Sequence, residues 1–143
     1  MSVEEKTFVG TALYEFQKDE AYLAPSQREH LKQILSLWRE QLMHQVDETV
    51  THLQDETSAN AADPLDRAAD EEAFSVELRT RDRERKLIRK IDETLELLLE
   101  DDFGYCESCG AEIGLRRLEV RPTASLCVDC KTVDEIREQR TTS

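Results

Sequence analysis

Four cysteines form the one strongly specific chemical pattern in this sequence. They lie as two CxxC pairs separated by seventeen residues, at Cys106, Cys109, Cys127 and Cys130. This spacing is typical of a structural zinc site, because each pair offers two thiolates from one tight turn and the spacer closes the coordination shell. Four thiolates leave zinc no open position, so we expect one structural Zn²⁺ and no catalysis at the metal. Two disulfides and a redox dithiol are the alternative interpretations.

The composition limits the kinds of partner this chain can bind. Its 143 residues carry a formal net charge of -13, and 36% of them are charged. Such an acidic protein is repelled by phosphate backbones, so we expect no direct binding to DNA. The sequence shows neither a signal peptide nor an apolar run long enough to span a membrane, which predicts a cytoplasmic location and no membrane partner. A protein with a basic surface is the better candidate partner.

The elements that position the cysteines are predicted to be helical. A capping box at Ser26-Gln27-Arg28-Glu29, directly after Pro25, predicts the start of a long helix. Apolar residues then recur at intervals of three and four, which is typical of a coiled-coil seam. These positions are Leu31, Leu35, Trp38, Leu42, Val46, Val50 and Leu53.

A second long helix is predicted to begin at Asp63-Pro64, with the aspartate as N-cap and proline in the first helical position. Its apolar positions repeat the same spacing, at Phe74, Leu78, Ile88, Ile91, Leu95 and Leu98 or Leu99. Two such helices joined by a short turn must run antiparallel, and at 1.5 Å per residue they form a finger about 45 to 50 Å long.

The sequence therefore predicts a mainly α protein with four parts: a long antiparallel coiled-coil hairpin projecting from a small zinc-finger base, with short flanking helices. We assign residues 1–25 to an N-terminal segment that packs on the base, and residues 26–102 to the finger, with its tip at 58–68. Residues 103–131 form the zinc finger, and residues 132–143 form a C-terminal helix that opens on a capping box at Thr132-Val133-Asp134-Glu135.

Charge is segregated along the predicted finger. From Asp55 to Glu72, around the tip, seven acidic residues stand against one base, Arg67. From Arg79 to Lys90 the sign reverses, with seven bases against Asp82 and Glu84. A solvated face with i,i+4 pairs accounts for individual residues, whereas the clustering favours an acidic tip on a shaft that meets an acidic surface or an anion.

These motifs, in this order, resemble the DksA family of bacterial RNA polymerase regulators. The resemblance rests on DPLDRAA at 63–69, RTRDRERKLI at 79–88, DFGYCESCG at 102–110, RPTA at 121–124 and LCVDCK at 126–131, and it covers Ser26 to about Arg137. Because all four cysteines are present, the chain resembles the zinc-holding members of that family.

The resemblance implies a function that the residues alone do not name. Members insert the coiled coil into the secondary channel of RNA polymerase and act with the alarmone ppGpp at promoters of ribosomal RNA and of amino-acid biosynthesis. Their motifs assign tip functions to Asp63, Asp66 and Ala68, and a contact with the polymerase rim to Arg83. They assign ppGpp binding, together with the polymerase, to Lys90, Arg121 and Lys131. The implied protein is a monomer and not an enzyme.

Two other functional classes fit parts of the sequence. A transcript-cleavage factor of similar finger shape would use paired tip acids such as Asp63 and Asp66 to hold a catalytic metal. A thiol-based redox sensor would use the cysteines reversibly. Both tip acids also have a structural interpretation, as an N-cap and as a first-turn acid that complements the helix dipole.

Overall fold

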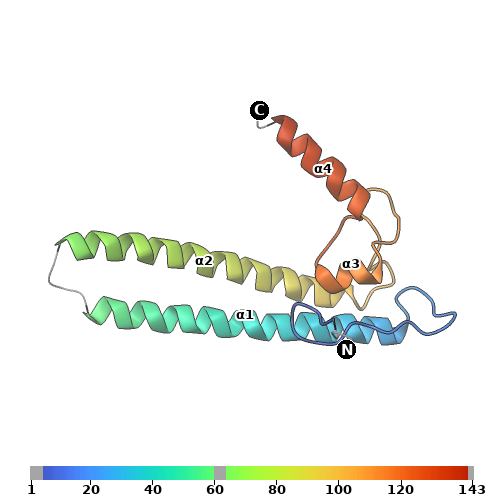
Figure 1. Cartoon of the computed structure of the whole chain (residues 1–143), viewed down its shortest axis with the longest axis horizontal. Coiled ribbons are helices and arrows are strands. Elements are labelled where there is room, and N and C mark those ends of the chain that lie inside the picture. The colour runs from blue at the N-terminus through green and yellow to red at the C-terminus, as the bar shows by residue number, and fades with distance from the viewer. Residues whose placement is uncertain (1–4, 60–63, 142–143) are drawn as a thin grey trace. The chain divides into compact units, whose positions relative to one another are not determined.

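The computed structural model describes residues 5–59 and 64–141, with the side chains of residues 49–67 and 70 left out. Within these residues, four helices follow one another: α1 (Pro25–Ala59), α2 (Pro64–Leu97), α3 (Leu115–Val120) and α4 (Val128–Thr141) (Figure 1). Among the described residues, β-structure is limited to two isolated antiparallel bridges, Lys6 with Ala12 and Tyr105 with Glu112. The predicted mainly α fold is confirmed.

The chain divides into two compact units. One consists of Trp38–Asp92, which comprises the later part of α1 and most of α2; the other joins Met1–Leu37 to Glu93–Ser143. We call them the hairpin unit and the base unit. Both long helices pass from one unit into the other, so neither unit coincides with the residue ranges assigned from the sequence.

The hairpin unit is an antiparallel pair of helices (Figure 1). Leu42 and Val46 of α1 and Ile88 and Ile91 of α2 are buried, as the apolar spacing predicts. Across the pair, the Nε of Arg39 donates to the Oδ1 of Asp92 at 2.7 Å. Because both side chains are almost half exposed, this ion pair contributes little stability, and the apolar seam holds the helices together.

The first turn of α1 differs from the prediction. The helix begins at Pro25, and Ser26 lies inside it, where its hydroxyl donates to the Glu20 carboxylate at 2.9 Å. The buried Gln27 instead reaches back, and its Oε1 accepts from the backbone N–H of Leu23 at 2.8 Å. The predicted start of the helix at Ser26 is therefore wrong, because proline already has the φ angle of the first helical position.

The core of the base unit comes from α1, α3 and the segment between α2 and α3, whereas α4 contributes no buried residue. Leu31, Ile34 and Leu35 of α1 are completely buried, together with Leu118 of α3. Leu98, Phe103 and Ile113 of the segment between α2 and α3, and Leu115 at the start of α3, complete this core. Ile34 was not among the predicted seam positions; it is buried because the base unit covers a wider stripe of α1 than a partner helix alone.

The last helix, α4, begins at Val128, four residues before the predicted capping box. The backbone N–H of Lys131 donates to the carbonyl of Cys127 at 2.9 Å, which closes the first turn. Thr132 lies inside the helix, and its hydroxyl donates to the carbonyl of Val128 at 2.9 Å. The prediction that Thr132 caps this helix is therefore wrong, because the helix already begins at Val128, directly after Cys127.

Among the described residues, no helix is long and apolar enough to cross a membrane.

Candidate functional site

The four cysteines lie close enough together to share one metal ion. All four Sγ atoms lie within 4.8 Å of one another, and those of Cys109 and Cys127 are 3.7 Å apart. A tetrahedral zinc with Zn–S bonds of about 2.3 Å requires sulfur atoms about 3.8 Å apart. The donor set and its spacing therefore fit zinc, and when bound the metal supplies a closed four-thiolate linkage between two loops.

The first cysteine pair is held by a tight turn. The N–H of Cys106 donates to the carbonyl of Ala111 at 2.7 Å, and the N–H of Gly110 donates to the carbonyl of Cys106 at 2.9 Å. Gly110 has a φ of 77°, a conformation that favours glycine, and this permits the chain to reverse directly after Cys109. The local sequence thus explains why these two thiols face the same point.

The second pair lies at the start of α4. Cys127 directly precedes the helix and Cys130 falls in its first turn, so both thiols lie at the positive end of the helix dipole. The N–H of Glu107 donates to the carbonyl of Ser125 at 2.9 Å and joins the two cysteine loops by backbone. A cluster of thiolates, which carries excess negative charge, is favoured in this position.

Electrostatics in the cluster differ from thiol to thiol. The backbone N–H of Cys127 lowers the pKa of Cys106 to about 6, which favours its thiolate form. Hydrogen bonds with the other thiols, first with that of Cys127, raise the pKa of Cys130 to about 12. Zinc takes cysteine in its deprotonated form, so a bound metal ion would stabilise the thiolate form of this site.

A tyrosine outside the zinc loops anchors them to the base unit. The hydroxyl of Tyr22 donates to the carbonyl of Gly104 at 2.7 Å and accepts from the N–H of Gly114 at 3.0 Å. Burial raises the pKa of Tyr22, which keeps the hydroxyl protonated and able to donate. Gly104 has a φ of 94°, and a Cβ there would overlap the Leu23 side chain. Only glycine fits this position.

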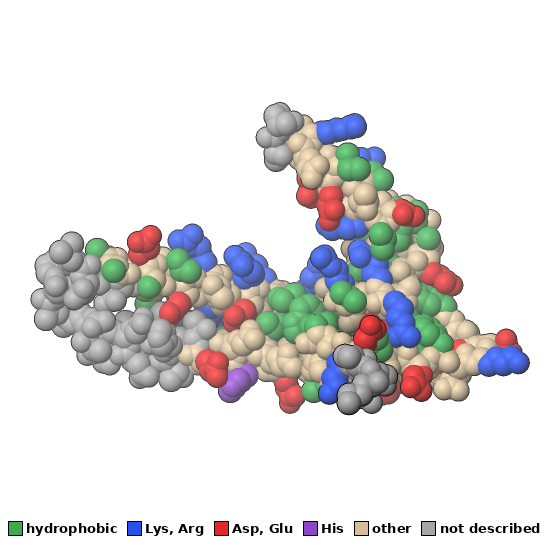
Figure 2. All heavy atoms as spheres, viewed as in Figure 1, with side chains coloured by type: hydrophobic (Ala, Val, Ile, Leu, Met, Phe, Trp, Pro, Cys, Tyr) green, Lys and Arg blue, Asp and Glu red, His purple; other side chains and the backbone are tan. Residues whose placement is uncertain are grey.

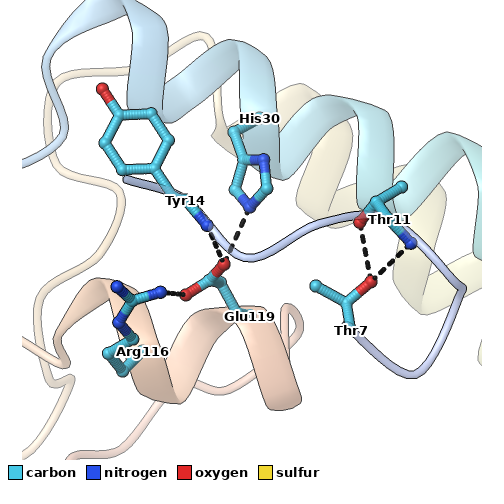
Figure 3. A network of polar contacts seen from close by, with 6 residues as sticks. All are labelled: Thr7, Thr11, Tyr14, His30, Arg116 and Glu119. Carbon is cyan, nitrogen blue, oxygen red and sulfur yellow. Dashed lines mark hydrogen bonds and ion pairs between the residues drawn. The ribbon is translucent and has the colours of Figure 1, made fainter. Parts of the chain in front are cut away.

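A second anchor is a buried carboxylate that joins three segments (Figure 3). Glu119 of α3 is 1% exposed, and its Oε2 accepts from the backbone N–H of Tyr14 at 2.9 Å and contacts the Nε2 of His30 at 2.8 Å. Its Oε1 accepts from Arg116 at 2.8 Å. Nearby, the hydroxyls of Thr7 and Thr11 are paired at 2.7 Å. Sequence reasoning missed Glu119 and His30, because their separation of 89 residues leaves no local signal.

The predicted tip residues are only partly described. Asp63 lies outside the described residues, as does the side chain of Asp66, which belongs to the first turn of α2. Ala68 is an exposed residue of α2. Their assignment as tip residues stays a prediction.

The predicted basic contacts fall in both units. Arg83 and Lys90 are exposed residues of α2 in the hairpin unit. Arg121 directly follows α3, and Lys131 lies on α4, both in the base unit. The convergence of Lys90 with Arg121 and Lys131 therefore stays a prediction.

A helical hairpin joined to a four-cysteine metal site defines a class of zinc-finger protein, and family models specify that class. Residues 27–98 match the N-terminal domain of DnaK suppressor protein DksA, and residues 101–135 match the prokaryotic dksA/traR C4-type zinc finger. The chain belongs to the DksA family, and its cysteines form the zinc-finger site of that family.

Individual relatives agree with this assignment. The chain is 60% identical to the RNA polymerase-binding transcription factor DksA of Escherichia coli (strain K12), over 92% of this chain and 86% of that protein. It is 56% identical to the protein of the same name from Haemophilus influenzae, over 92% and 90%. The structure of transcription factor DksA2 from Pseudomonas aeruginosa matches with a TM-score of 0.77 at 38% identity, covering 86% of this chain and 94% of that chain.

Proposed function

We propose that this protein binds bacterial RNA polymerase and regulates transcription initiation by inserting its helical hairpin into the secondary channel. The observation that carries the proposal is the 60% identity to RNA polymerase-binding transcription factors over 92% of the chain. The antiparallel hairpin and the four-cysteine cluster support it, because both of the elements that define the family are built here.

The basic flank of α2 is the proposed contact with the polymerase. Figure 2 shows Lys and Arg side chains gathered along this helix. Arg79, Arg83, Arg85, Lys86 and Arg89 are exposed among them. In a chain of net charge -13, such a cluster supplies local attraction to an acidic rim that the rest of the protein lacks.

We assign the remaining predicted residues to regulation within the complex. The effector ppGpp is bound by Lys90, Arg121 and Lys131 together with the polymerase, and the acids Asp63 and Asp66, beside Ala68, act at the tip. Charge-assisted hydrogen bonds from Lys and Arg suit a multiply charged phosphate ligand. The protein itself acts as a cytoplasmic monomer that binds neither DNA nor membrane, holds one structural zinc and catalyses no reaction.

A binding experiment tests the polymerase contact. Fluorescence anisotropy of the labelled, zinc-loaded protein with purified bacterial RNA polymerase should give a saturable isotherm that weakens with salt. Arg83→Ala should weaken binding by about 2- to 10-fold, whereas Lys18→Ala, at an exposed base of the N-terminal segment, should leave it unchanged. Equal isotherms for the parent and the Arg83 variant at low salt would refute the contact.

Transcription from a ribosomal RNA promoter tests the effector site. A variant with Lys90, Arg121 and Lys131 all changed to alanine should bind polymerase nearly as well as the parent and lose the added inhibition that ppGpp gives. Each change should cost about 1–3 kcal/mol of ppGpp affinity in the complex. A full ppGpp response in the triple variant would place the effector elsewhere.

The same assay separates action at the tip from capping. Asparagine caps a helix about as well as aspartate, so Asp63→Asn with Asp66→Asn should fold normally and bind polymerase. Inhibition should nevertheless collapse, because the negative charges are gone. Retained inhibition would reduce both acids to a structural role, and lost binding would show that they dock the finger.

A further inference from the structure

The base unit contains an open groove that the proposed polymerase function does not use. It lies between the last turn of α2 and the two cysteine loops, with a volume of about 260 Å³. Its apolar lining comes from Leu97, Phe103, Tyr105 and Ile113. Leu97 and Tyr105 are 49% and 42% exposed, so part of this apolar lining stays accessible to a partner.

The rim of this groove is acidic. Glu100, Asp102 and Glu107 line it, and no Lys, Arg or His residue does. All three residues are exposed, so their carboxylates are accessible to a partner. An occupant must therefore bring apolar groups for the floor and positive charges for the rim. We call this feature the acidic groove.

The shape of the acidic groove excludes several other occupants. Pockets for drug-sized ligands have volumes of about 300–1,000 Å³, so this groove suits one or two side chains rather than a cofactor. Among the described residues, the four cysteines form the only group of three or more potential metal ligands close together, so the rim acids do not converge on a cation. Separate carboxylates around an apolar floor fit separate cationic side chains.

The walls are fixed before any partner binds. The hydroxyl of Tyr22 donates to the carbonyl of Gly104, and the backbone hydrogen bond from Glu107 to Ser125 joins the two cysteine loops that line the groove opposite α2. The end of α2 is held by Arg28, whose guanidinium donates to the carbonyls of Leu98 and Glu100 at 2.6 and 3.1 Å. A preformed groove loses little conformational entropy on binding, which favours affinity from a small contact.

We propose that the acidic groove binds a short segment of a partner protein in which apolar side chains are flanked by arginine or lysine. The apolar pair sits on the floor formed by Leu97 and Tyr105, and the flanking cations pair with Glu100 and Glu107. This surface is separate from the basic flank of α2 and from the tip residues, so it does not depend on the proposed polymerase contact.

A blocked hexapeptide, Arg-Arg-Leu-Phe-Arg-Arg, is a suitable probe for the groove. Titrated into the ¹⁵N-labelled, zinc-loaded full chain, it should shift amide resonances of residues 97–107, 113 and 123–125 in a saturable way. A peptide with glutamate in place of arginine, and one with Ser-Ser in place of Leu-Phe, should each bind at least about fivefold more weakly, because each lacks one half of the required chemistry.

Matched variants locate the site. The double variant Glu100→Gln, Glu107→Gln should bind the probe about fivefold more weakly. The control double variant Glu93→Gln, Glu96→Gln removes the same charge from exposed positions outside the groove, and it should bind the probe as the parent does. Leu97→Ser should weaken it similarly, while Leu99→Ser, at an 83% exposed leucine outside the groove, should not. All six substituted positions are exposed, and an otherwise unchanged spectrum checks that each variant folds.

Three outcomes would overturn the proposal. Equal weakening by both glutamine pairs would mean general attraction to an acidic protein, and equal binding of the Ser-Ser peptide would mean that the apolar floor is not used. Concentration-dependent self-association that Leu97→Ser abolishes would make a second copy of this chain the occupant.

Discussion

Replacement of Glu119 should cost the base unit more stability than any other exchange of a single charged residue. This carboxylate is 1% exposed and receives hydrogen bonds from a backbone N–H, a histidine ring and an arginine, from three different segments (Figure 3). Changing Glu119 to alanine leaves the N–H of Tyr14 and the ring of His30 without their acceptor, in a place that water reaches poorly. At the surface, water would replace a lost carboxylate as hydrogen-bond acceptor, whereas at this buried position it does so poorly.

The size of the effect follows from the three contacts. A hydrogen bond to a charged group contributes about 1.5–3 kcal/mol, and the two bonds to Oε2 would sum to roughly 3–6 kcal/mol if they were independent. Neighbouring contacts are not independent, and Arg116 is 52% exposed, so its bond adds less than about 1 kcal/mol. We therefore expect Glu119→Ala to lower the free energy of unfolding by about 3–5 kcal/mol.

Urea unfolding of the zinc-saturated protein, followed by far-ultraviolet circular dichroism, measures this loss. Glu112→Ala, at an exposed carboxylate of the same unit, is the matched control. Glu119→Gln should lie between the two, because its amide keeps one acceptor oxygen but turns a donor towards other donors. Hydrogen exchange of the α3 amides should rise in parallel. If the free energy of unfolding of Glu119→Ala lies within about 1 kcal/mol of that of the control, the view that this carboxylate joins the three segments is refuted.

Three further predictions concern the zinc loops. Gly104→Ala should destabilise the zinc-loaded protein by more than about 2 kcal/mol. Gly110 also has a positive φ, but a Cβ there would meet open space, so Gly110→Ala should cost only about 1 kcal/mol. Equal urea midpoints for the two variants would contradict this. Tyr22→Phe keeps the ring and loses the two hydroxyl bonds, so it should cost about 1–2 kcal/mol by the same assay, and an unchanged midpoint would show that water replaces the hydroxyl. Removal of zinc by a chelator should release one metal ion per chain and lower the melting temperature, while most of the helical signal survives because the hairpin unit holds no cysteine; unchanged melting would refute the structural role.

Local patterns in the sequence predicted most of the fold. The cysteine spacing gave the metal site because both pairs are short turns, whose geometry depends on neighbouring residues. The apolar stripe gave the helical hairpin, since Leu31, Leu42 and Ile91 have to face a partner helix whatever else the chain does. Of the two candidates at the end of the second helix, Leu98 is buried and Leu99 is exposed, a choice that the repeat alone leaves open.

Competing local signals account for the errors at helix ends. Ser26 and Thr132 both begin sequences that suit a capping box, but the two helices already begin at Pro25 and Val128. Contacts over long sequence separations could not be predicted from the sequence. Tyr14 is hydrogen-bonded to Glu119 across 105 residues, and Tyr22 is hydrogen-bonded to Gly104 across 82. No periodicity or motif reports such pairs, because they arise only once the core has formed.

We expect the position of α4 to depend on the zinc site more than on the packing of its own side chains. None of the residues of α4 is buried, and the thiols of Cys127 and Cys130 at its start belong to the same cluster as Cys106 and Cys109 of the loop that precedes α3. Lys131 directly follows one of these ligands, whereas Arg83 lies on α2, whose apolar seam does not involve the metal. If Lys131 contributes to the effector site and Arg83 to docking, as we propose, the two functions differ in their need for zinc. Partial removal of zinc should then abolish the response to ppGpp at concentrations of chelator that still leave polymerase binding intact, because the metal positions only the first of these residues.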